Sequence, residues 1–285
     1  MSDLSVVIPT FDTAAMTLRC CHAVLATMPH ATEVIVADDG STDGTAELLA
    51  QDAPDVRVVR HESNRGFASA ANLGVAVARG RVIVLINSDT VVENGALQAL
   101  LGAFDADCSL GVAGAQLLNE DGTPQWSGGL TPTLPWMVGV VSGAGHLARY
   151  FRLQGNSRRE LDWVSGAAMA FRREVWNLAG PLNERFRFYC QDLEFCIRAR
   201  DAGWRVRVVP EARVTHALGG TVTPGSPLRH DPERLWPDLL AWGTARYGRA
   251  WSVVARMVLV TAASLRIVLT RDETTDALKR AMRNL

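Results

Sequence analysis

Short runs of consecutive apolar residues alternate with longer segments of helical apolar spacing along the first 107 residues. The apolar runs predict buried strands at 4–10, 32–38, 56–61 and 82–86. The helical spacing lies between and after them, at 14–28, 45–50, 66–80 and 94–107. Strands that alternate with helices predict an α/β fold with a doubly wound, mostly parallel sheet and helices on both of its faces.

Polar side chains follow three of these strands directly. The strand at 82–86 has only apolar residues, yet Asn87, Ser88 and Asp89 come straight after it. An acid there either caps or turns the chain, or it holds a metal ion in a cleft. In doubly wound sheets, ligands bind at the carboxyl ends of the strands. The residues expected to converge at that edge are Thr10, Asp12, Asp38, Asp39 and Asp89.

The second half of the chain has a less regular pattern. Several Pro and Gly residues interrupt 131–160, which we interpret as a long excursion. Order returns at 161–180, a short helix is expected at 191–203, and 204–216 has the pattern of a strand. We find no internal repeat and no low-complexity linker.

The C-terminal segment is apolar and basic. Its apolar core at 253–269 is shorter than the ~20 residues of a membrane span and contains Arg256 and Arg266, so we predict no transmembrane helix. From Arg246 onward there are eight Lys or Arg residues and three Asp or Glu residues. Such a segment either lies on an anionic membrane or packs on the domain with its arginine stems along the surface.

Charge and cysteine content narrow the function classes. The formal net charge of −1 gives no reason to expect binding to nucleic acid. The five cysteines are odd in number and lack zinc-site spacing, so we expect reduced thiols and a cytoplasmic protein. The N-terminus is too short and too acidic for a signal peptide.

The loop after the first strand lacks the glycine motifs of two nucleotide-binding classes. Neither GxGxxG nor GxxxxGKS follows that strand, which argues against nicotinamide-dependent and P-loop enzymes. Acids at strand ends suit another task, in which hydrogen bonds hold a base and ribose and a divalent metal holds a diphosphate. Carboxylates together with substrate phosphates are the ligands that Mg²⁺ and Mn²⁺ prefer.

An ordered set of motifs carries a family resemblance over roughly residues 4 to 220. The motifs are VVIPTFD, VIVADDGSTDGT, NRGFASAANLG, VLINSDT, WVSGAAMAFRREVW, and FYCQDLEFCIRARDAGW followed by VTH. In this order they resemble the family 2 inverting glycosyltransferases of GT-A fold, especially the bacterial rhamnosyltransferase-like branch.

The resemblance implies a role for each matching position. The implied nucleotide-sugar contacts are Pro9, Thr10, Asp12, Asp38, Asp39, Asn64, Gly66, Phe67, Asn72, Asn87 and Ser88. Asp192 matches the catalytic base, while Asp89 and His216 match positions that hold Mg²⁺ or Mn²⁺ and the diphosphate. The residues expected on the acceptor side are Trp163, Ser165, Gly166, Gln191 and Glu194. Trp163 and Trp176 are better explained as core residues than as sugar platforms.

The chain departs from the family pattern in three places. Gln191 stands where the family usually has Glu, Glu194 where Asp is common, and Asn87 where the metal motif begins with Asp. Glu194 therefore remains an alternative base. Plain structural roles also remain open, since Asp89 could cap a helix and Asp192 could favour a helix dipole. His216 could be an ordinary strand-end histidine.

The expected protein is an inverting glycosyltransferase. Residues 1–220 would form the GT-A domain, with a nucleotide-sugar half at 1–118 and an acceptor half at 119–220, and 221–285 a C-terminal helical extension. The resemblance implies dTDP-rhamnose or a UDP-sugar as donor and a saccharide or polyprenyl-linked acceptor used in cell-envelope polysaccharide synthesis. The protein would be cytoplasmic, with peripheral contact on the inner face of the membrane.

Two other functions remain as alternatives. A nucleotidyltransferase shares the α/β layout and metal carboxylates, but it usually carries a glycine-rich basic loop after the first strand, which PTFDTAAM lacks. A nucleotide-sugar-binding protein without catalytic activity would be consistent with the departures at Gln191 and Glu194.

Overall fold

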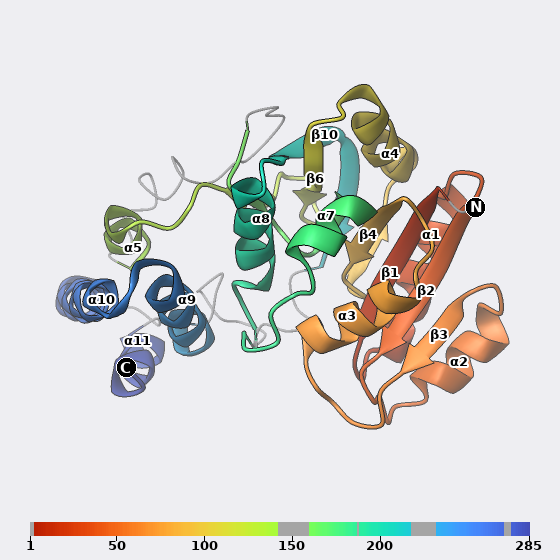
Figure 1. Ribbon diagram of the computed structural model, residues 1–285. Helices are drawn as coiled ribbons and strands as arrows, with labels where there is room; N and C mark the ends of the chain where they lie inside the picture. The colour runs from red at the N-terminus through yellow and green to blue at the C-terminus, as the bar shows by residue number, and fades with distance from the viewer. Residues whose placement is uncertain (1–2, 142–159, 187, 218–231, 271–274) are drawn as a thin grey trace.

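An eight-stranded sheet organises most of the chain (Figure 1). The computed structural model describes residues 3–141, 160–186, 188–217, 232–270 and 275–285. The strands run in the order β3-β2-β1-β4-β9-β6-β10-β5. Their bounds are β1 Leu4–Thr10, β2 Thr32–Asp38, β3 Arg57–Arg60, β4 Val82–Ile86, β5 Thr90–Val92, β6 Leu110–Leu118, β9 Ala168–Arg172 and β10 Arg205–His216. A small second sheet pairs β7, Gly128–Gly129, with β8, Trp163–Val164.

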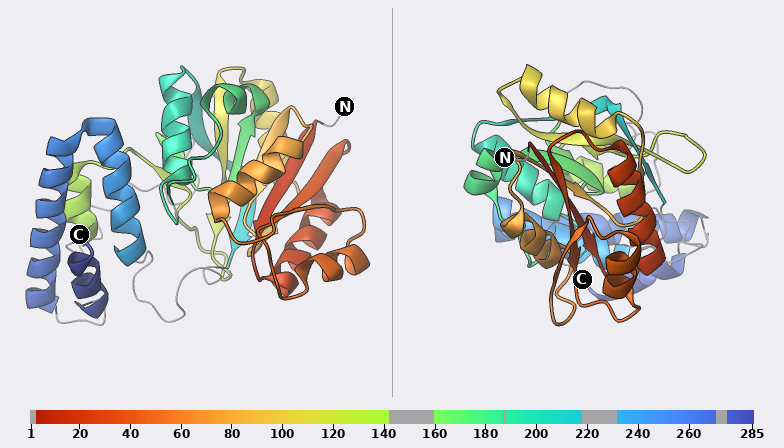
Figure 2. Two further views of the ribbon diagram at one scale, coloured as in Figure 1. Left: turned by 60° about the horizontal axis from the view of Figure 1, so that its bottom comes forward. Right: turned by 90° about the vertical axis from the view of Figure 1, so that its right-hand side faces the viewer.

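Helices cover both faces of the large sheet, as predicted (Figure 2). One face packs on α1 Ala14–Thr27, α2 Thr45–Asp52 and α4 Ala96–Ala106. The other packs on α3 Phe67–Val77, α7 Arg173–Ala179 and α8 Gln191–Asp201. Successive side chains of β1 point to opposite faces of the sheet, so Val6 and Ile8 pack in the first core and Val7 packs in the second. Each face therefore presents apolar side chains to the helices that cover it. Because both faces of the sheet are buried, the central strands do not alternate between apolar and polar residues and are instead continuous apolar runs.

The sheet is mixed but mostly parallel. Strands β3, β2, β1 and β4 pair in parallel, as do β6 and β10. Strand β9 runs antiparallel to both β4 and β6, and β5 runs antiparallel to β10. The insertion of β9 means that the later part of the chain completes the sheet begun by the earlier part.

The predicted elements of the first 107 residues are all present, with ends shifted by a few residues. Strands β5 and β6 are not among the predicted elements, although all nine residues of β6 are buried. In the excursion at 131–160, the structure contains α5, Leu134–Val141. Residues 142–159 of that excursion and the expected boundary at residue 220 lie outside the described residues.

Three helices form the C-terminal extension: α9 Pro232–Tyr247, α10 Arg249–Thr270 and α11 Thr275–Arg283. They pack with one another and α10 contacts α5, so this group lies beside the sheet rather than on it (Figures 1 and 2). The expectation that the apolar segment is too short to span a membrane is wrong. The helix begins at Arg249, and the 21 residues Arg249–Leu269 are long and apolar enough, by length and composition, to cross a membrane.

Candidate functional site

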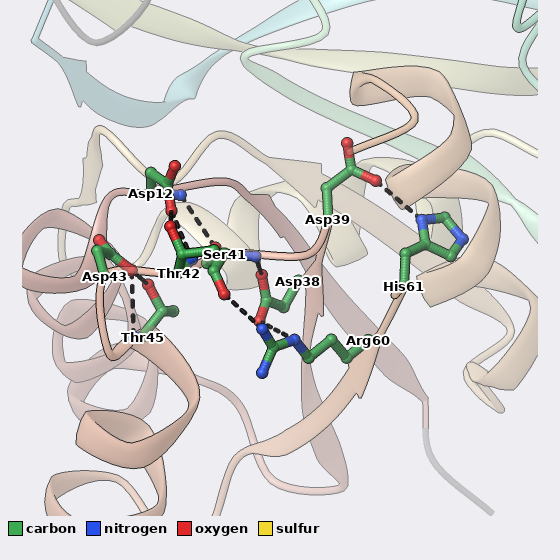
Figure 3. Close-up of polar contacts among 9 residues, drawn as sticks. All are labelled: Asp12, Asp38, Asp39, Ser41, Thr42, Asp43, Thr45, Arg60 and His61. Atoms are coloured by element: carbon green, nitrogen blue, oxygen red, sulfur yellow. Dashed lines mark hydrogen bonds and ion pairs between the residues drawn. The ribbon is translucent and has the colours of Figure 1, made fainter. Parts of the chain in front are cut away.

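The loop after β2 is organised by the buried carboxylate of Asp38 (Figure 3). Its Oδ1 accepts a hydrogen bond from the Ser41 N–H at 2.8 Å, which closes the turn. Its Oδ2 lies 3.2 Å from Nε of Arg60, at the end of β3. Asp38 therefore shapes the turn and joins it to the neighbouring strand.

Asp39 fixes a second loop, between β3 and α3. Its Oδ1 lies 2.8 Å from Nδ1 of His61, and its Oδ2 accepts the backbone N–H groups of Arg65 and Gly66 at 2.9 and 2.7 Å. Gly66 has a φ of +96°, a conformation that favours glycine. The acid pair thus holds the two loops that the resemblance assigns to the nucleotide.

Asp12 joins the loop after β1 to the loop after β2 (Figure 3). Its backbone N–H donates to Oγ of Ser41 at 2.9 Å, and its Oδ1 accepts the Thr42 N–H at 2.7 Å. Asp43, from the same turn, accepts the Ala14 N–H at the start of α1 at 2.8 Å. Partial burial raises the pKa of Asp43, but hydrogen bonds from Thr45 and Ala14 outweigh this and lower it.

A cluster of hydroxyl groups connects the end of β1 to the end of β4. Thr10 Oγ1 lies 2.8 Å from Thr13 Oγ1 and 2.6 Å from Thr17 Oγ1. Thr13 Oγ1 lies 3.2 Å from Oγ of Ser88. The ends of β1, β2 and β4 are therefore linked at one edge of the sheet, where the polar residues were expected to converge.

His216, at the end of β10, faces Asp89 with Nε2 at 3.4 Å from Oδ1. Its other ring nitrogen, Nδ1, lies 2.8 Å from Oε1 of Gln125. The amide nitrogen of Gln125 donates to Asn119 Oδ1 and to the His216 carbonyl, so Oε1 is the acceptor that meets the ring. Nδ1 of the neutral ring must then carry the hydrogen, which leaves Nε2 with a lone pair directed at a carboxylate.

Two lone-pair atoms at 3.4 Å form a favourable site for a cation. Asn87 Oδ1, from the same turn as Asp89, is buried without a hydrogen-bond partner. Asp89 itself is 8% exposed. No group of three or more His, Cys, Asp or Glu with metal-site geometry occurs in the described residues, so substrate oxygens would have to complete the coordination. This donor set fits Mg²⁺ or Mn²⁺.

Asp192 lies in the first turn of α8, beside the turn between β8 and β9. Its Oδ2 accepts the Gly166 N–H and its Oδ1 accepts the Leu193 N–H, both at 2.8 Å. Burial raises the pKa of this carboxyl, and the two backbone hydrogen bonds oppose that change. A carboxylate with a raised pKa is a stronger proton acceptor once it is ionised.

Glu194, the alternative base, is held in a different arrangement. Its Oε2 lies 2.8 Å from Nη2 of Arg198, one turn further along α8. Arg198 also donates to the carbonyls of Ala179 and Pro181, so the pair attaches α8 to the end of α7. Gln191 is buried, and its Nε2 donates to the Phe186 carbonyl at 3.0 Å. Glu194 is thus engaged in an ion pair, whereas the carboxylate of Asp192 meets backbone N–H groups.

The segment that leads into α8 is held by Asp238 of α9. Oδ2 of Asp238, which is 8% exposed, accepts the N–H groups of Phe188 and Tyr189 at 3.0 and 2.9 Å. Cys190 follows with a φ of +67° and precedes the first residue of α8. The C-terminal extension therefore contacts the backbone immediately before the proposed base.

Asn72 of α3 bonds the same region from the other side. Its amide nitrogen donates to the Leu182 carbonyl at 3.0 Å and to Glu184 Oε1 at 2.9 Å, and its Oδ1 accepts the Leu182 N–H at 2.9 Å. Both polar groups of this amide are engaged with protein atoms. Asn72 thus joins α3 to the segment before α8, and its nucleotide role remains a prediction.

The other predicted residues occupy several positions around the site. Trp163 is buried, with Nε1 donating to the Leu130 carbonyl, as expected for a core residue. Ser165 stands one residue before Gly166, and its Oγ accepts the Ala167 N–H at 3.3 Å. Pro9 is a buried residue of β1, Asn64 is exposed in the loop before α3, and Phe67 opens α3.

Four further residues shape this site and are not among the predicted ones, namely Arg60, His61, Gln125 and Asp238. Arg60 and His61 end an apolar strand in the same way as the recognised acids, and that signal could have identified them. Gln125 and Asp238 are far in sequence from their partners, and the local pattern contains no sign of those contacts. The exposed ring of Phe11, between Thr10 and Asp12, was also passed over.

Comparisons with known proteins identify the family. Residues 5–178, more than half of the chain, match glycosyl transferase family 2. The chain is 28% identical over 221 residues to the N-acetylglucosaminyl-diphospho-decaprenol L-rhamnosyltransferase of Mycobacterium tuberculosis. That alignment covers 67% of this chain and 70% of the relative.

Solved structures share the fold at low sequence identity. The mannosyltransferase PcManGT of Pyrobaculum calidifontis, in complex with GDP-Man and Mn²⁺, matches with a TM-score of 0.58 and 18% identity, over 99% of this chain and 86% of that one. GalNAc-T7, with UDP, GalNAc and Mn²⁺, matches with a TM-score of 0.65 and 16% identity, over 99% of this chain and 54% of that one. The fold is thus that of the GT-A glycosyltransferases, and the chain belongs to glycosyl transferase family 2.

Proposed function

We propose that this enzyme transfers rhamnose, with inversion, from dTDP-rhamnose to a hydroxyl group of a polyprenyl-linked saccharide in cell-envelope polysaccharide synthesis. Membership of family 2 establishes sugar transfer from a nucleotide sugar. The choice of rhamnose and of a lipid-linked acceptor is supported by the mycobacterial L-rhamnosyltransferase, at 28% identity. A UDP-sugar is the alternative donor.

The observation that carries the inverting mechanism is the placement of Asp192. Hydrogen bonds from Gly166 and Leu193 fix both carboxylate oxygens, and burial raises the pKa of the group. In the reaction, this carboxylate removes the proton from the acceptor hydroxyl as its oxygen attacks the anomeric carbon. The bond from the anomeric carbon to the diphosphate oxygen breaks, and the nucleoside diphosphate leaves with the bonding electrons.

Asp89 and His216 are the proposed metal-binding residues, with Gln125 fixing the histidine ring. A bound Mg²⁺ or Mn²⁺ would offset the negative charge that develops on the departing diphosphate. Two solved structures of the same fold were determined with Mn²⁺ and a nucleotide or nucleotide sugar, which supports this assignment. The metal would bind to the lone pair of His216 Nε2, which the hydrogen bond between Nδ1 and Gln125 leaves directed at Asp89.

The donor nucleotide would lie at the joined ends of β1, β2 and β4. Asp12, Asp38 and Asp39 hold the loops there through hydrogen bonds with backbone and side-chain groups. These bonds fix the loop shape before the donor arrives, so less ordering is required on binding. The exposed ring of Phe11 provides an apolar surface for a base.

The test is a donor panel assayed with the whole protein, Mn²⁺ and a polyprenyl-diphosphate-linked N-acetylglucosamine acceptor. Release of dTDP from dTDP-rhamnose, together with an acceptor larger by one deoxyhexose, is the expected result. Turnover of a UDP-sugar in its place would correct the donor while preserving sugar transfer. Release of inorganic diphosphate would indicate nucleotidyl transfer, and binding without any product would indicate a protein that lacks catalytic activity.

A further inference from the structure

Helix α10 presents a large apolar face to solvent. Seven of its large hydrophobic side chains are between 36% and 72% exposed, whereas most such residues of the chain are buried. These seven residues are Val253, Val254, Met257, Val260, Leu265, Val268 and Leu269. Isolated exposed hydrophobic residues are ordinary, but a contiguous set on one helix indicates an interaction surface. We call these seven residues the α10 face.

The opposite side of α10 accounts for its packing within the protein. Ser252, Ala255, Leu259 and Ala263 are buried. The helix contacts α5, α9 and α11, and it lies at the edge of the molecule (Figures 1 and 2). Only 22% of its apolar window is buried, far less than in a core helix. Among the described residues, α5, α9 and α11 pack on the other side of α10, and the α10 face remains exposed to solvent.

The charges near this helix favour an anionic partner. The segment 246–285 carries eight Lys or Arg residues against three acids, although the whole chain has a formal net charge of −1. Among the exposed residues of α10 itself, Arg249 and Arg256 are charged, and both lie outside the set of seven. An uncharged apolar stripe within a basic segment is the composition of a helix that lies in an anionic membrane interface.

We propose that the α10 face inserts into the surface of an anionic lipid bilayer, with the helix parallel to the membrane plane. A spanning orientation would require α10 to leave α5, α9 and α11. It would also carry Arg256, which donates to the carbonyl of Leu285, and Arg266 into the hydrocarbon region. The interfacial orientation retains these contacts. This inference goes beyond the proposed function, because binding to lipid is measured without any donor or acceptor.

The experiment is sedimentation of the full chain with vesicles of phosphatidylcholine containing phosphatidylglycerol. Met257→Glu/Val268→Glu places two charges on the α10 face. Leu178→Glu/Met28→Glu is the matched control, because it adds the same charge at exposed hydrophobic residues outside the C-terminal helices. The partition coefficient should fall at least about tenfold in the first variant, since burial of one such side chain is worth about tenfold or more. It should change little in the control.

Further outcomes separate this proposal from its rivals. Equal binding by both variants would overturn it, and so would failure of the wild-type protein to bind. A wild-type dimer that the first variant converts to monomer, without lipid binding, would assign the face to a second copy of the chain. An alkaline carbonate wash should release the bound protein, and retention after the wash would indicate a spanning helix instead.

Discussion

At the residue scale, the acids of the site differ in the groups that each one meets. Asp38 and Asp39 accept hydrogen bonds from loop backbone, Asp89 faces a histidine lone pair, and the half-buried Asp192 meets two backbone donors. The surroundings of the four carboxylates therefore differ, and these differences suit the same type of side chain to a different task at each position.

The raised pKa of Asp192 predicts the acidic limb of the pH–rate profile. Burial disfavours the charged form, so the group loses its proton at a higher pH than the ordinary value of 3.8. Activity requires the ionised form, and kcat/KM should fall as the pH is lowered through this raised pKa. The same shift means that the folded protein binds this proton more tightly than the unfolded chain, so its stability decreases as the pH rises through that window. An acidic limb that persists in Asp192→Asn would contradict the assignment.

Substitution of Gln125 tests the proposed metal site without changing the proposed metal ligands, Asp89 and His216. Gln125→Leu removes the acceptor that fixes the His216 ring, so the Mn²⁺ concentration for half-maximal nucleotide binding should rise ~10–100-fold. Titration calorimetry with Mn²⁺ and nucleoside diphosphate measures this. Gln51→Leu, at an exposed residue of α2, is the control. An unchanged metal requirement in Gln125→Leu would mean that His216 does not serve this site.

Asp39 should contribute to both stability and nucleotide affinity. Asp39→Ala leaves the N–H groups of Arg65 and Gly66 without their acceptor, which should lower the free energy of unfolding by ~1–3 kcal/mol for each donor left unpaired. Nucleotide affinity should fall because the loop before α3 loses its anchor. Urea denaturation and calorimetry measure the two effects, with the exposed Asp55→Ala as control. Unchanged nucleotide affinity would assign Asp39 a purely structural role.

At the scale of elements, much of the fold follows from apolar periodicity, but some of it does not. The strands and helices before residue 107 could be predicted because each apolar run is short and bounded by polar residues or glycine. Strand β6 was missed since LGVAGAQLL contains several small residues and few β-branched ones, so it lacks a strong strand signal. The antiparallel insertion of β9 between β4 and β6 could not be predicted, because local pattern contains no information on strand order.

The contact between α9 and the segment before α8 predicts that the extension influences catalysis. Asp238→Ala should release the N–H groups of Phe188 and Tyr189 and lower kcat through displacement of Asp192, with less effect on the KM for the donor. Asp238→Asn retains an acceptor oxygen and should restore most of the rate. If both variants lose only thermal stability and keep the wild-type kcat, Asp238 does not position the base.

At the scale of the whole molecule, residues distant in sequence complete a site begun by the first strands. In the proposed site, the turns after β1, β2 and β4 would form the nucleotide side, whereas His216, Gly166 and Asp192 come from the second half of the chain. The order of the sequence motifs could predict that the residues after β1, β2 and β4 lie together at one edge of the sheet, and the structure brings them together there. The hydrogen bonds of Gln125 and Asp238 could not be predicted because these contacts depend on tertiary packing. The helical extension contributes the contact between Asp238 and the segment before the proposed base, and it also carries the exposed α10 face.

The most direct measurement of the central claim compares Asp192→Asn and Glu194→Gln in the transfer reaction. We expect turnover to fall ~10²–10⁴-fold in Asp192→Asn, with donor affinity nearly unchanged, because the change removes the proton acceptor and preserves the shape. Glu194→Gln should lose far less. Nuclear magnetic resonance of the wild-type product should show an inverted anomeric configuration. An active Asp192→Asn beside an inactive Glu194→Gln would contradict the assignment of the base, and a retained configuration would contradict the single displacement.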